Sequence, residues 1–315
     1  MAGPARLSRR RLLQLAGGVP FGALLAACGG SPGSTLLSAP EPAPAEPTHT
    51  PTPEPPFIVA AGEQRRLLMA GTAQETELFI FGSGQPGPVL AVLGGVHGNE
   101  PAGWLAAEEL RDEFRPAAGA FLIVPRANIL ATQQFVRTTD ELGDLNRLYP
   151  GDADGLPMAR MAKEIVDTLR EFRASVAIDM HESWSFYTDR TDTQTGTAFL
   201  GQTVSSSSAQ GLALGRTVVD AVDQRIRAPH EEMILREFPP PGFVFPTPTP
   251  GAANPTTVPS TGLPLGGRSR SSLGLSTHVS GLIALLVEMG QQQQLSRRVA
   301  LHVDIVEEVA RQIGI

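Results

Sequence analysis

Two histidines and two glutamates are placed where they could hold a metal ion and carry out acid–base chemistry. His97 and Glu100 are three residues apart and directly follow an apolar run, and His181 ends a second apolar run. Two imidazoles and one carboxylate form a typical catalytic zinc set, because they leave one coordination position open for water. Bound zinc lowers the pKa of that water to about 7. The spacing therefore predicts one Zn²⁺ per chain on His97, Glu100 and His181.

Other side chains could supply the remaining parts of a hydrolytic reaction. Glu288 ends a third apolar run, where it is expected to act as the general base for the attacking water. The planar guanidinium of Arg147 could bind a substrate carboxylate, and Arg137 could polarise the scissile carbonyl and stabilise the oxyanion. These residues together predict a metal-assisted hydrolase.

The apolar runs belong to a pattern of alternating strands and helices. We expect strands at 88–96, 120–124, 175–180 and 281–287, and helices at 100–114, 159–172, 211–226 and 295–313. Continuous apolar strands that alternate with helices are typical of a mainly parallel sheet covered on both faces. Ligands bind such sheets at the carboxyl ends of the strands. His97, His181 and Glu288 all lie at such ends.

The motifs that carry these residues resemble, in the same order, those of the succinylglutamate desuccinylase/aspartoacylase family of the zinc carboxypeptidase superfamily. The matching stretches are 94–100, Pro125 with Asn128, Arg137, 144–147 with 150–151, 179–181 and 287–290. The resemblance implies a single α/β domain with a mixed, mainly parallel sheet sandwiched by helices. It also implies zinc on the three predicted ligands and Glu288 as general base. Asn146 and Arg147 would bind the substrate carboxylate, and Arg137 would assist at the carbonyl.

Some neighbouring residues keep alternative roles. Arg126 is an alternative to Arg137 at the substrate carbonyl. Asp179 is a candidate for orienting a zinc ligand from behind. Glu182 is expected either to be solvated or to lie behind the ligands, and the glutamines at 291–294 suggest no function.

The N-terminal segment has the features of an export signal. Arg6 and the arginines at 9–11 precede an uncharged apolar stretch at 12–27, which is typical of a signal peptide. Residues 8–14 resemble a twin-arginine motif, with an ordinary Sec signal as the alternative, and residues 25–29 resemble a lipoprotein cleavage box. We expect residues 1–28 to be a signal peptide that ends at a lipidated Cys28. This anchor would hold the protein on the outer face of the cytoplasmic membrane, in the cell envelope.

Composition divides the rest of the chain. Residues 29–56 are rich in proline and alanine and are expected to form a disordered tether. Residues 57–315 are expected to form the hydrolase domain, with a proline-rich insertion at about 238–270. The net charge of −7 argues against a nucleic acid partner, because phosphate binding relies on a basic face.

The residues and the resemblance together predict a zinc-dependent hydrolase that cleaves an amide bond in a carboxylate-bearing substrate, as an N-acyl amino acid deacylase does. One alternative is a metallocarboxypeptidase or amidase acting on peptides, such as cell-wall stem peptides, which suits a location outside the membrane. A further alternative is a non-catalytic lipoprotein that binds a ligand in the same cleft. Glu288 argues against this last alternative, because a binding protein needs no general base.

Overall fold

The computed structural model describes residues 57–191, 197–238 and 270–315. The predicted signal peptide with Cys28, the predicted tether and nearly all of the predicted insertion lie outside these residues. Within the described ranges, no helix is both long enough and apolar enough to cross a membrane.

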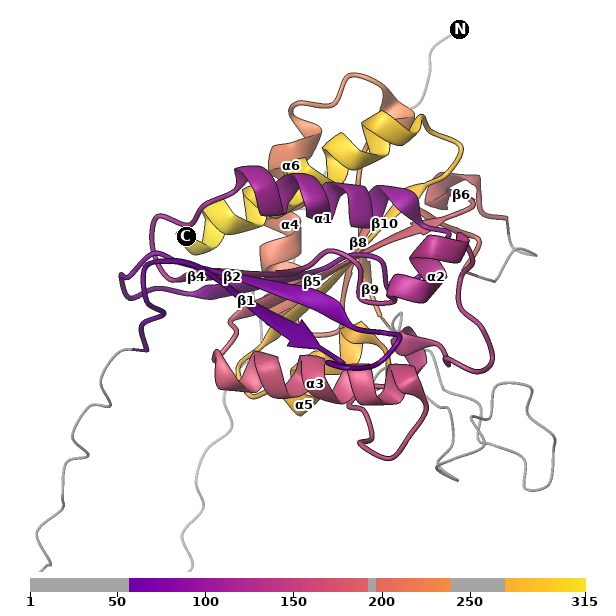
Figure 1. Ribbon diagram of the computed structural model, residues 1–315. Coiled ribbons are helices and arrows are strands. Elements are labelled where there is room, and N and C mark those ends of the chain that lie inside the picture. Colours follow the sequence, from indigo (N-terminus) through magenta and orange to yellow (C-terminus); the bar gives the residue numbers. More distant parts are fainter. Residues whose placement is uncertain (1–56, 192–196, 239–269) are drawn as a thin grey trace, which may run out of the picture. The chain divides into compact units, whose positions relative to one another are not determined.

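A mixed sheet of eight strands forms the centre of the described region (Figure 1). The spatial order is β1-β2-β4-β3-β5-β10-β8-β9. The strands are β1 (Gly62–Leu68), β2 (Thr76–Gly82), β3 (Val89–Leu93), β4 (Ala120–Val124), β5 (Val176–Ser183), β8 (Thr203–Ser206), β9 (Ile234–Glu237) and β10 (Ile283–Gly290). The short strands β6 (Ser185–Phe186) and β7 (Phe199–Gly201) pair separately.

The central strands β4, β3, β5 and β10 are neighbours and run parallel. Their carboxyl ends therefore meet at one edge of the sheet. The pairs β1–β2, β2–β4 and β10–β8 are antiparallel, and β8–β9 is parallel. The sheet is mixed and mostly parallel, as the sequence predicts.

Helices cover both faces of this sheet. The helices α1 (Pro101–Glu113), α4 (Ala209–Asp223) and α6 (Leu295–Ile313) pack on one face, and α3 (Pro157–Glu171) and α5 (Leu275–His278) on the other. The remaining helical segments are α2 (Ile129–Gln134) and the short 3-10 turns η1 (Leu145–Arg147), η2 (Tyr187–Asp189), η3 (Pro229–Glu231) and η5 (Ser272–Gly274). Each face of the sheet thus has its own apolar cluster.

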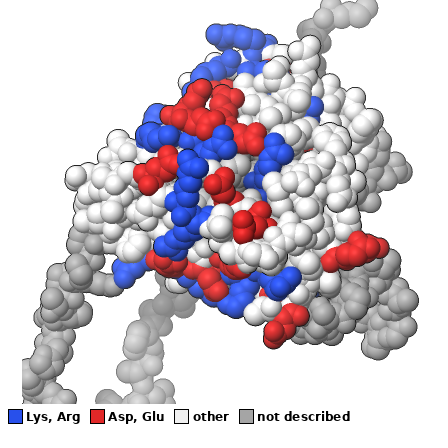
Figure 2. Space-filling model, in the orientation of Figure 1, with Lys and Arg blue, Asp and Glu red and all other residues white. Residues whose placement is uncertain are grey.

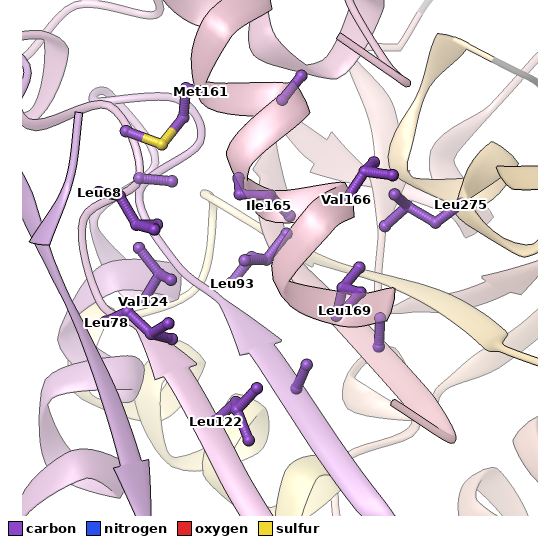
Figure 3. Packing of buried hydrophobic residues seen from close by; sticks show 14 of the residues in the cluster. Leu68, Leu78, Leu93, Leu122, Val124, Met161, Ile165, Val166, Leu169 and Leu275 are labelled. Atoms are coloured by element: carbon purple, nitrogen blue, oxygen red, sulfur yellow. The ribbon is translucent and has the colours of Figure 1, made fainter. Parts of the chain in front are cut away.

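The α3 cluster shows why the central strands are held firmly. Met161, Ile165 and Leu169 lie at helical spacing on α3 and pack in the same buried cluster as Leu93 of β3 and Leu122 of β4 (Figure 3). All five side chains are at most 3% exposed. Burying each contributes about 1.5–3 kcal/mol. This packing provides a rigid support for residues at the strand ends.

The structure contains every strand and helix that the sequence predicts, with ends shifted by a few residues. It adds strands that the prediction missed, notably β2, although this strand contains an apolar run at 78–81, and β1. The β1 segment Gly-Glu-Gln-Arg-Arg-Leu-Leu has six exposed residues out of seven, because it is an edge strand. An exposed edge strand has no apolar run to indicate it.

Acidic and basic side chains are interspersed on the face shown in Figure 2. Among the described residues, several arginines form close ion pairs, such as Arg66 with Glu171 and Arg126 with Glu108, both at 2.7 Å. The face shown in Figure 2 is therefore mixed in charge rather than basic.

Candidate metal centre

The turn between β3 and α1 presents His97 and Glu100 at the carboxyl edge of the sheet. Gly95 adopts a positive φ of 63°, which favours glycine. At Gly98, a Cβ atom would come within 1.9 Å of the backbone oxygen of Ala131. Gly98 therefore allows the turn to press against α2, and this packing fixes the backbone that carries both candidate ligands.

His97, Glu100 and His181 converge on one point. The Nδ1 of His97 lies 2.8 Å from Glu100 Oε1, and the Nδ1 of His181 lies 2.7 Å from Glu100 Oε2. The two Nδ1 atoms are 3.1 Å apart. All three residues are buried, and their donor atoms lie within 4.8 Å of one another. The structure brings together the three ligands that the sequence predicts.

The outer nitrogens of the two histidines face carboxylates. His97 Nε2 lies 3.1 Å from Asp144 Oδ1, and His181 Nε2 lies 2.7 Å from Asp179 Oδ2. A neutral histidine that donates from Nε2 carries its lone pair on Nδ1. Both lone pairs then point toward each other and toward Glu100, an arrangement that either a proton on one ring nitrogen or a metal cation between them satisfies. The donor set therefore fits zinc, which takes such imidazole and carboxylate ligands.

The charges of these groups shift their pKa values in a consistent way. Burial alone lowers the pKa of His181, but the carboxylates of Asp179 and Glu100 outweigh it and raise that pKa well above its ordinary value. Burial raises the pKa of Glu100, but the two histidines reverse this effect and lower it below the ordinary range. Asp144 also has a lowered pKa, because the hydrogen bond to His97 and the charges of His97 and Arg137 overcome its burial. The carboxylates are thus held in the ionised form that binds cations.

Glu288 lies beside the donor set on the neighbouring strand. It is the register partner of His181 across the parallel β5–β10 pair, so both side chains project on the same face of the sheet. It is 8% exposed. Burial, supported by the negative charge of Glu100, raises the pKa of Glu288 to about 7 against the opposing effect of His181. A carboxylate with a pKa near neutrality suits a general base.

Arg137 contacts the donor set. Its Nη1 donates to Glu100 Oε1 and its Nη2 to Asp144 Oδ2, each at 3.2 Å. The alternative candidate, Arg126, instead donates to Glu108 and lies over the Trp104 ring at 4.0 Å. Arg137 is thus the one of the two that contacts the ligands, and its role at a substrate carbonyl stays a prediction.

The two predicted carboxylate-binding residues occupy different environments. Arg147 is exposed and donates to the backbone oxygen of Asn146 at 2.6 Å. Asn146 is 6% exposed. Its Oδ1 accepts from the Ser272 N–H at 2.8 Å, and its Nδ2 lies 3.3 Å from His181 Nε2. In this structure the Asn146 amide faces the protein interior, while the Arg147 guanidinium faces outward.

Sequence reasoning gave Asp144 no role of its own. The structure shows that it contacts His97 and Arg137, and that its Oδ1 also accepts the N–H of Asn146 at 3.0 Å at the start of η1. The sequence feature that could have indicated a role for Asp144 is its position as the first residue of the 144–147 motif. Asp179 does lie behind His181, as the sequence analysis suggested.

Part of the chain is similar to known proteins. Residues 86–186 match the succinylglutamate desuccinylase/aspartoacylase catalytic domain. The N-alpha-acetyl-L-2,4-diaminobutyric acid deacetylase of Halomonas elongata is 34% identical over 98 residues, which cover 30% of this chain and 28% of the deacetylase.

Two solved structures share the fold. The Cell Shape Determinant protein Csd4 of Helicobacter pylori, in its apo form, aligns with a TM-score of 0.57 at 16% identity, over 73% of this chain and 51% of that chain. A succinylglutamatedesuccinylase/aspartoacylase from Rhodobacter sphaeroides aligns with a TM-score of 0.53 at 18% identity, over 84% of this chain and 68% of that chain. The chain thus spans about half the length of Csd4 and a smaller part of the deacetylase.

The matched range includes the three converging ligands and both candidate substrate-facing arginines, and Glu288 lies beyond it. The fold around the site is a mixed, mostly parallel sheet, which the chain shares with these two solved structures. Residues 86–186 are therefore similar to the succinylglutamate desuccinylase/aspartoacylase catalytic domain.

Proposed function

We propose that this protein is a zinc-dependent amidohydrolase that removes an acyl group from a carboxylate-bearing N-acyl amino compound. The observation that carries the proposal is the convergence of two Nδ1 atoms and one carboxylate beside a second buried carboxylate, Glu288. A metal site alone would serve binding or structure. A general base on the adjacent strand points to hydrolysis.

Each residue then has a defined task. Zinc held by His97, Glu100 and His181 would supply Lewis-acid chemistry, acidifying water and polarising a carbonyl. Glu288 takes the proton from the attacking water and passes it to the leaving amine nitrogen as the amide bond breaks. Arg137, which already lies beside Glu100, stabilises the negative charge that develops on the carbonyl oxygen.

The substrate class follows from the exposed guanidinium and from the relative. Arg147 is an exposed arginine that follows Asn146, whose side chain lies beside His181, and its planar fork matches a carboxylate in a bidentate geometry. The relative from Halomonas elongata is named as a deacetylase of an N-acetylated diamino acid. The arginine fits a carboxylate of an N-acyl amino acid or of a peptide, and the name of the relative favours the small N-acyl amino acid.

A metal titration and a substrate comparison test this proposal. The full-length protein should contain one zinc per chain by elemental analysis, and His97→Ala should lose it. Zinc-loaded wild type should release free amine from N-acetyl and N-succinyl amino acids faster than it trims short peptides. Faster release of the C-terminal residue from peptides would instead support the carboxypeptidase alternative. Zinc binding without turnover of any amide would support a ligand-binding protein.

We also propose that the chain is exported and anchored through a lipid on Cys28. The proposal rests on the arginine-rich, apolar segment and the cleavage box that precedes this cysteine. Labelled palmitate should be incorporated into the wild-type protein in bacterial cells and not into Cys28→Ala. Equal labelling of both proteins would contradict the anchor.

A further inference from the structure

Adjacent residues of β5 serve opposite faces of the sheet. Side chains alternate along a strand, so Asp179 and His181 share the α3 face with Ala177. Glu182 shares the opposite face with Met180, which packs in the cluster formed by α1, α4 and α6. The residue after a metal ligand is therefore a carboxylate turned away from the metal and toward the helices.

Glu182 and the start of α1 are joined by two reciprocal hydrogen bonds. The Glu182 carboxylate accepts the backbone N–H of Ala102 through Oε2 at 2.9 Å. The backbone N–H of Glu182 donates to Oε2 of the ligand Glu100 at 3.0 Å. Glu100 is the N-cap residue of α1 but makes no side-chain capping bond itself. Glu182 therefore satisfies a helix N–H that would otherwise lack a partner and also holds the ligand oxygen.

Arg298 supplies the opposite charge from α6. Its Nη1 pairs with Glu182 Oε1, and its Nε donates to the Gln293 backbone oxygen at 3.0 Å. The Glu182 side chain is fully buried and that of Arg298 is 10% exposed. Arg298 lies in the first turn of α6, where the helix dipole disfavours a cation. A buried ion pair usually stabilises a fold no better than apolar residues would. This pair therefore calls for a role other than stability.

The β10–α6 loop reinforces the same region. The Gln291 side chain donates to the backbone oxygen of Asn99 at 2.9 Å, next to Glu100. The Gln291 backbone N–H donates to the Ser183 oxygen at 2.8 Å, two residues beyond His181. The loop that leads to Arg298 thus contacts both ligand-bearing segments.

We propose that Glu182 and Arg298 are positioning residues that fix the Glu100 carboxylate against His97 and His181 and so set the affinity of the site for zinc. The inference rests on the proposed zinc site. Glu182 contacts Glu100 through its backbone and α1 through its side chain, so any shift of its carboxylate moves the ligand that α1 carries. Arg298 holds that carboxylate in its orientation through the pair between Nη1 and Glu182 Oε1.

The test compares zinc binding by four full-length variants. Glu182→Gln keeps a hydrogen-bond acceptor without the charge, and Arg298→Lys keeps the charge. The double variant Glu182→Gln/Arg298→Met leaves no unpaired buried charge. The matched control is Arg297→Met, which removes the neighbouring α6 pair with Glu231, away from the ligands. Zinc dissociation constants come from chelator competition, and Co²⁺ absorption spectra report the ligand geometry.

Glu182→Gln and the double variant should bind zinc 10- to 100-fold more weakly and change the Co²⁺ spectrum, the range typical for residues that orient metal ligands. Arg298→Lys should bind within a few fold of wild type, and Arg297→Met should match it. The melting temperature in excess chelator separates fold damage from a change at the site.

Unchanged affinity and spectrum in the double variant, with normal wild-type binding, would overturn the positioning role alone. The positioning role would also be overturned if the double variant bound zinc more weakly and its melting temperature in excess chelator fell below that of the wild type by enough to account for the weaker binding. The pair would then only stabilise the fold. Failure of the wild type itself to bind zinc would reject the proposed function together with this inference.

Discussion

At the scale of single residues, carboxylates surround the two candidate histidine ligands. Glu100 lies between the Nδ1 atoms, and Asp144 and Asp179 each accept from an outer nitrogen. These acids make the imidazoles better donors and fix the tautomer that exposes Nδ1. Glu288 differs from them, because burial raises its pKa to about 7 while those of Glu100 and Asp144 fall. Environment thus divides four similar groups into ligand, orienting and proton-transfer roles.

Replacing Glu288 by glutamine should remove catalysis without removing the metal. The amide has nearly the same shape but cannot accept the proton of water, so kcat should fall by about 10²- to 10⁴-fold. Zinc content should stay at one per chain, as measured by elemental analysis. Glu109→Gln, at an exposed position of α1, is the control and should keep normal turnover. Normal turnover by zinc-loaded Glu288→Gln would show that another group is the base.

Asp179→Asn should weaken zinc binding. The amide cannot offer the full negative charge that polarises His181 from behind, so affinity should drop by about 10- to 100-fold. The measurement is chelator competition at neutral pH. Asp167→Asn, at a surface pair with Lys163, serves as the control and should bind zinc as wild type does. Equal affinity of Asp179→Asn and wild type would mean that the Asp179 contact has no part in metal binding.

At the scale of elements, the site depends on how closely α1 approaches β5. Gly103 lies on α1 against the strand, and a Cβ atom there would meet the Met180 backbone oxygen at 2.4 Å. Backbone atoms of a central strand cannot move aside without disturbing the sheet. Because Gly103 has no side chain, α1, which begins next to Glu100, can pack closely against β5.

Gly103→Ala should push α1 away from β5 and lower the free energy of unfolding by about 1–3 kcal/mol. It should also weaken zinc binding, since Glu100 precedes the displaced helix. Gly215→Ala on α4 is the matched control: its Cβ would meet the flexible end of Leu235, and the helix gains about 1 kcal/mol from alanine. Denaturant unfolding of both variants checks the comparison. Equal stabilities would show that α1 has room to shift.

At the scale of the whole molecule, the described region buries charged and titratable groups between sheet and helices. His302 on α6 is fully buried, and its burial lowers its pKa to about 3. The unfolded chain therefore protonates this histidine first as the pH falls below about 6.5. Folding stability is fully present above that pH and is lost progressively toward pH 3.

His302→Leu should flatten this acid dependence. Between pH 6.5 and 4 in excess chelator, wild type should lose up to about 1.4 kcal/mol of unfolding free energy per pH unit more than the variant does. The difference between the two slopes of unfolding free energy against pH reports on His302, because all other titratable groups are the same in both proteins. His230→Gln, at an exposed histidine, should keep the wild-type slope. Parallel curves for wild type and His302→Leu would contradict the buried neutral state.

The sequence by itself determined the central strands, the main helices and the three converging ligands. The reason is local: apolar runs, helical periodicity and the short His97–Glu100 spacing are visible within a few residues. Glu288 could be singled out in the same way, because a carboxylate at the end of an apolar strand is conspicuous. The polar edge strand β1 lacks such a pattern, so the sequence could not reveal it.

Asp179 could be proposed from the sequence as a group that orients His181, but only the tertiary structure decided that Asp144, Glu182 and Arg298 support the candidate ligands. Asp144 meets His97 across 47 residues of chain, and Arg298 meets Glu182 across 116. No local pattern encodes such pairs, because they depend on the strand order and on the helix that packs over each strand end. Strand alternation directs His181 toward the metal site and Glu182 toward α1 and α6. The packing of the helices on the two faces of the sheet then decides which groups the His181 and Glu182 side chains contact.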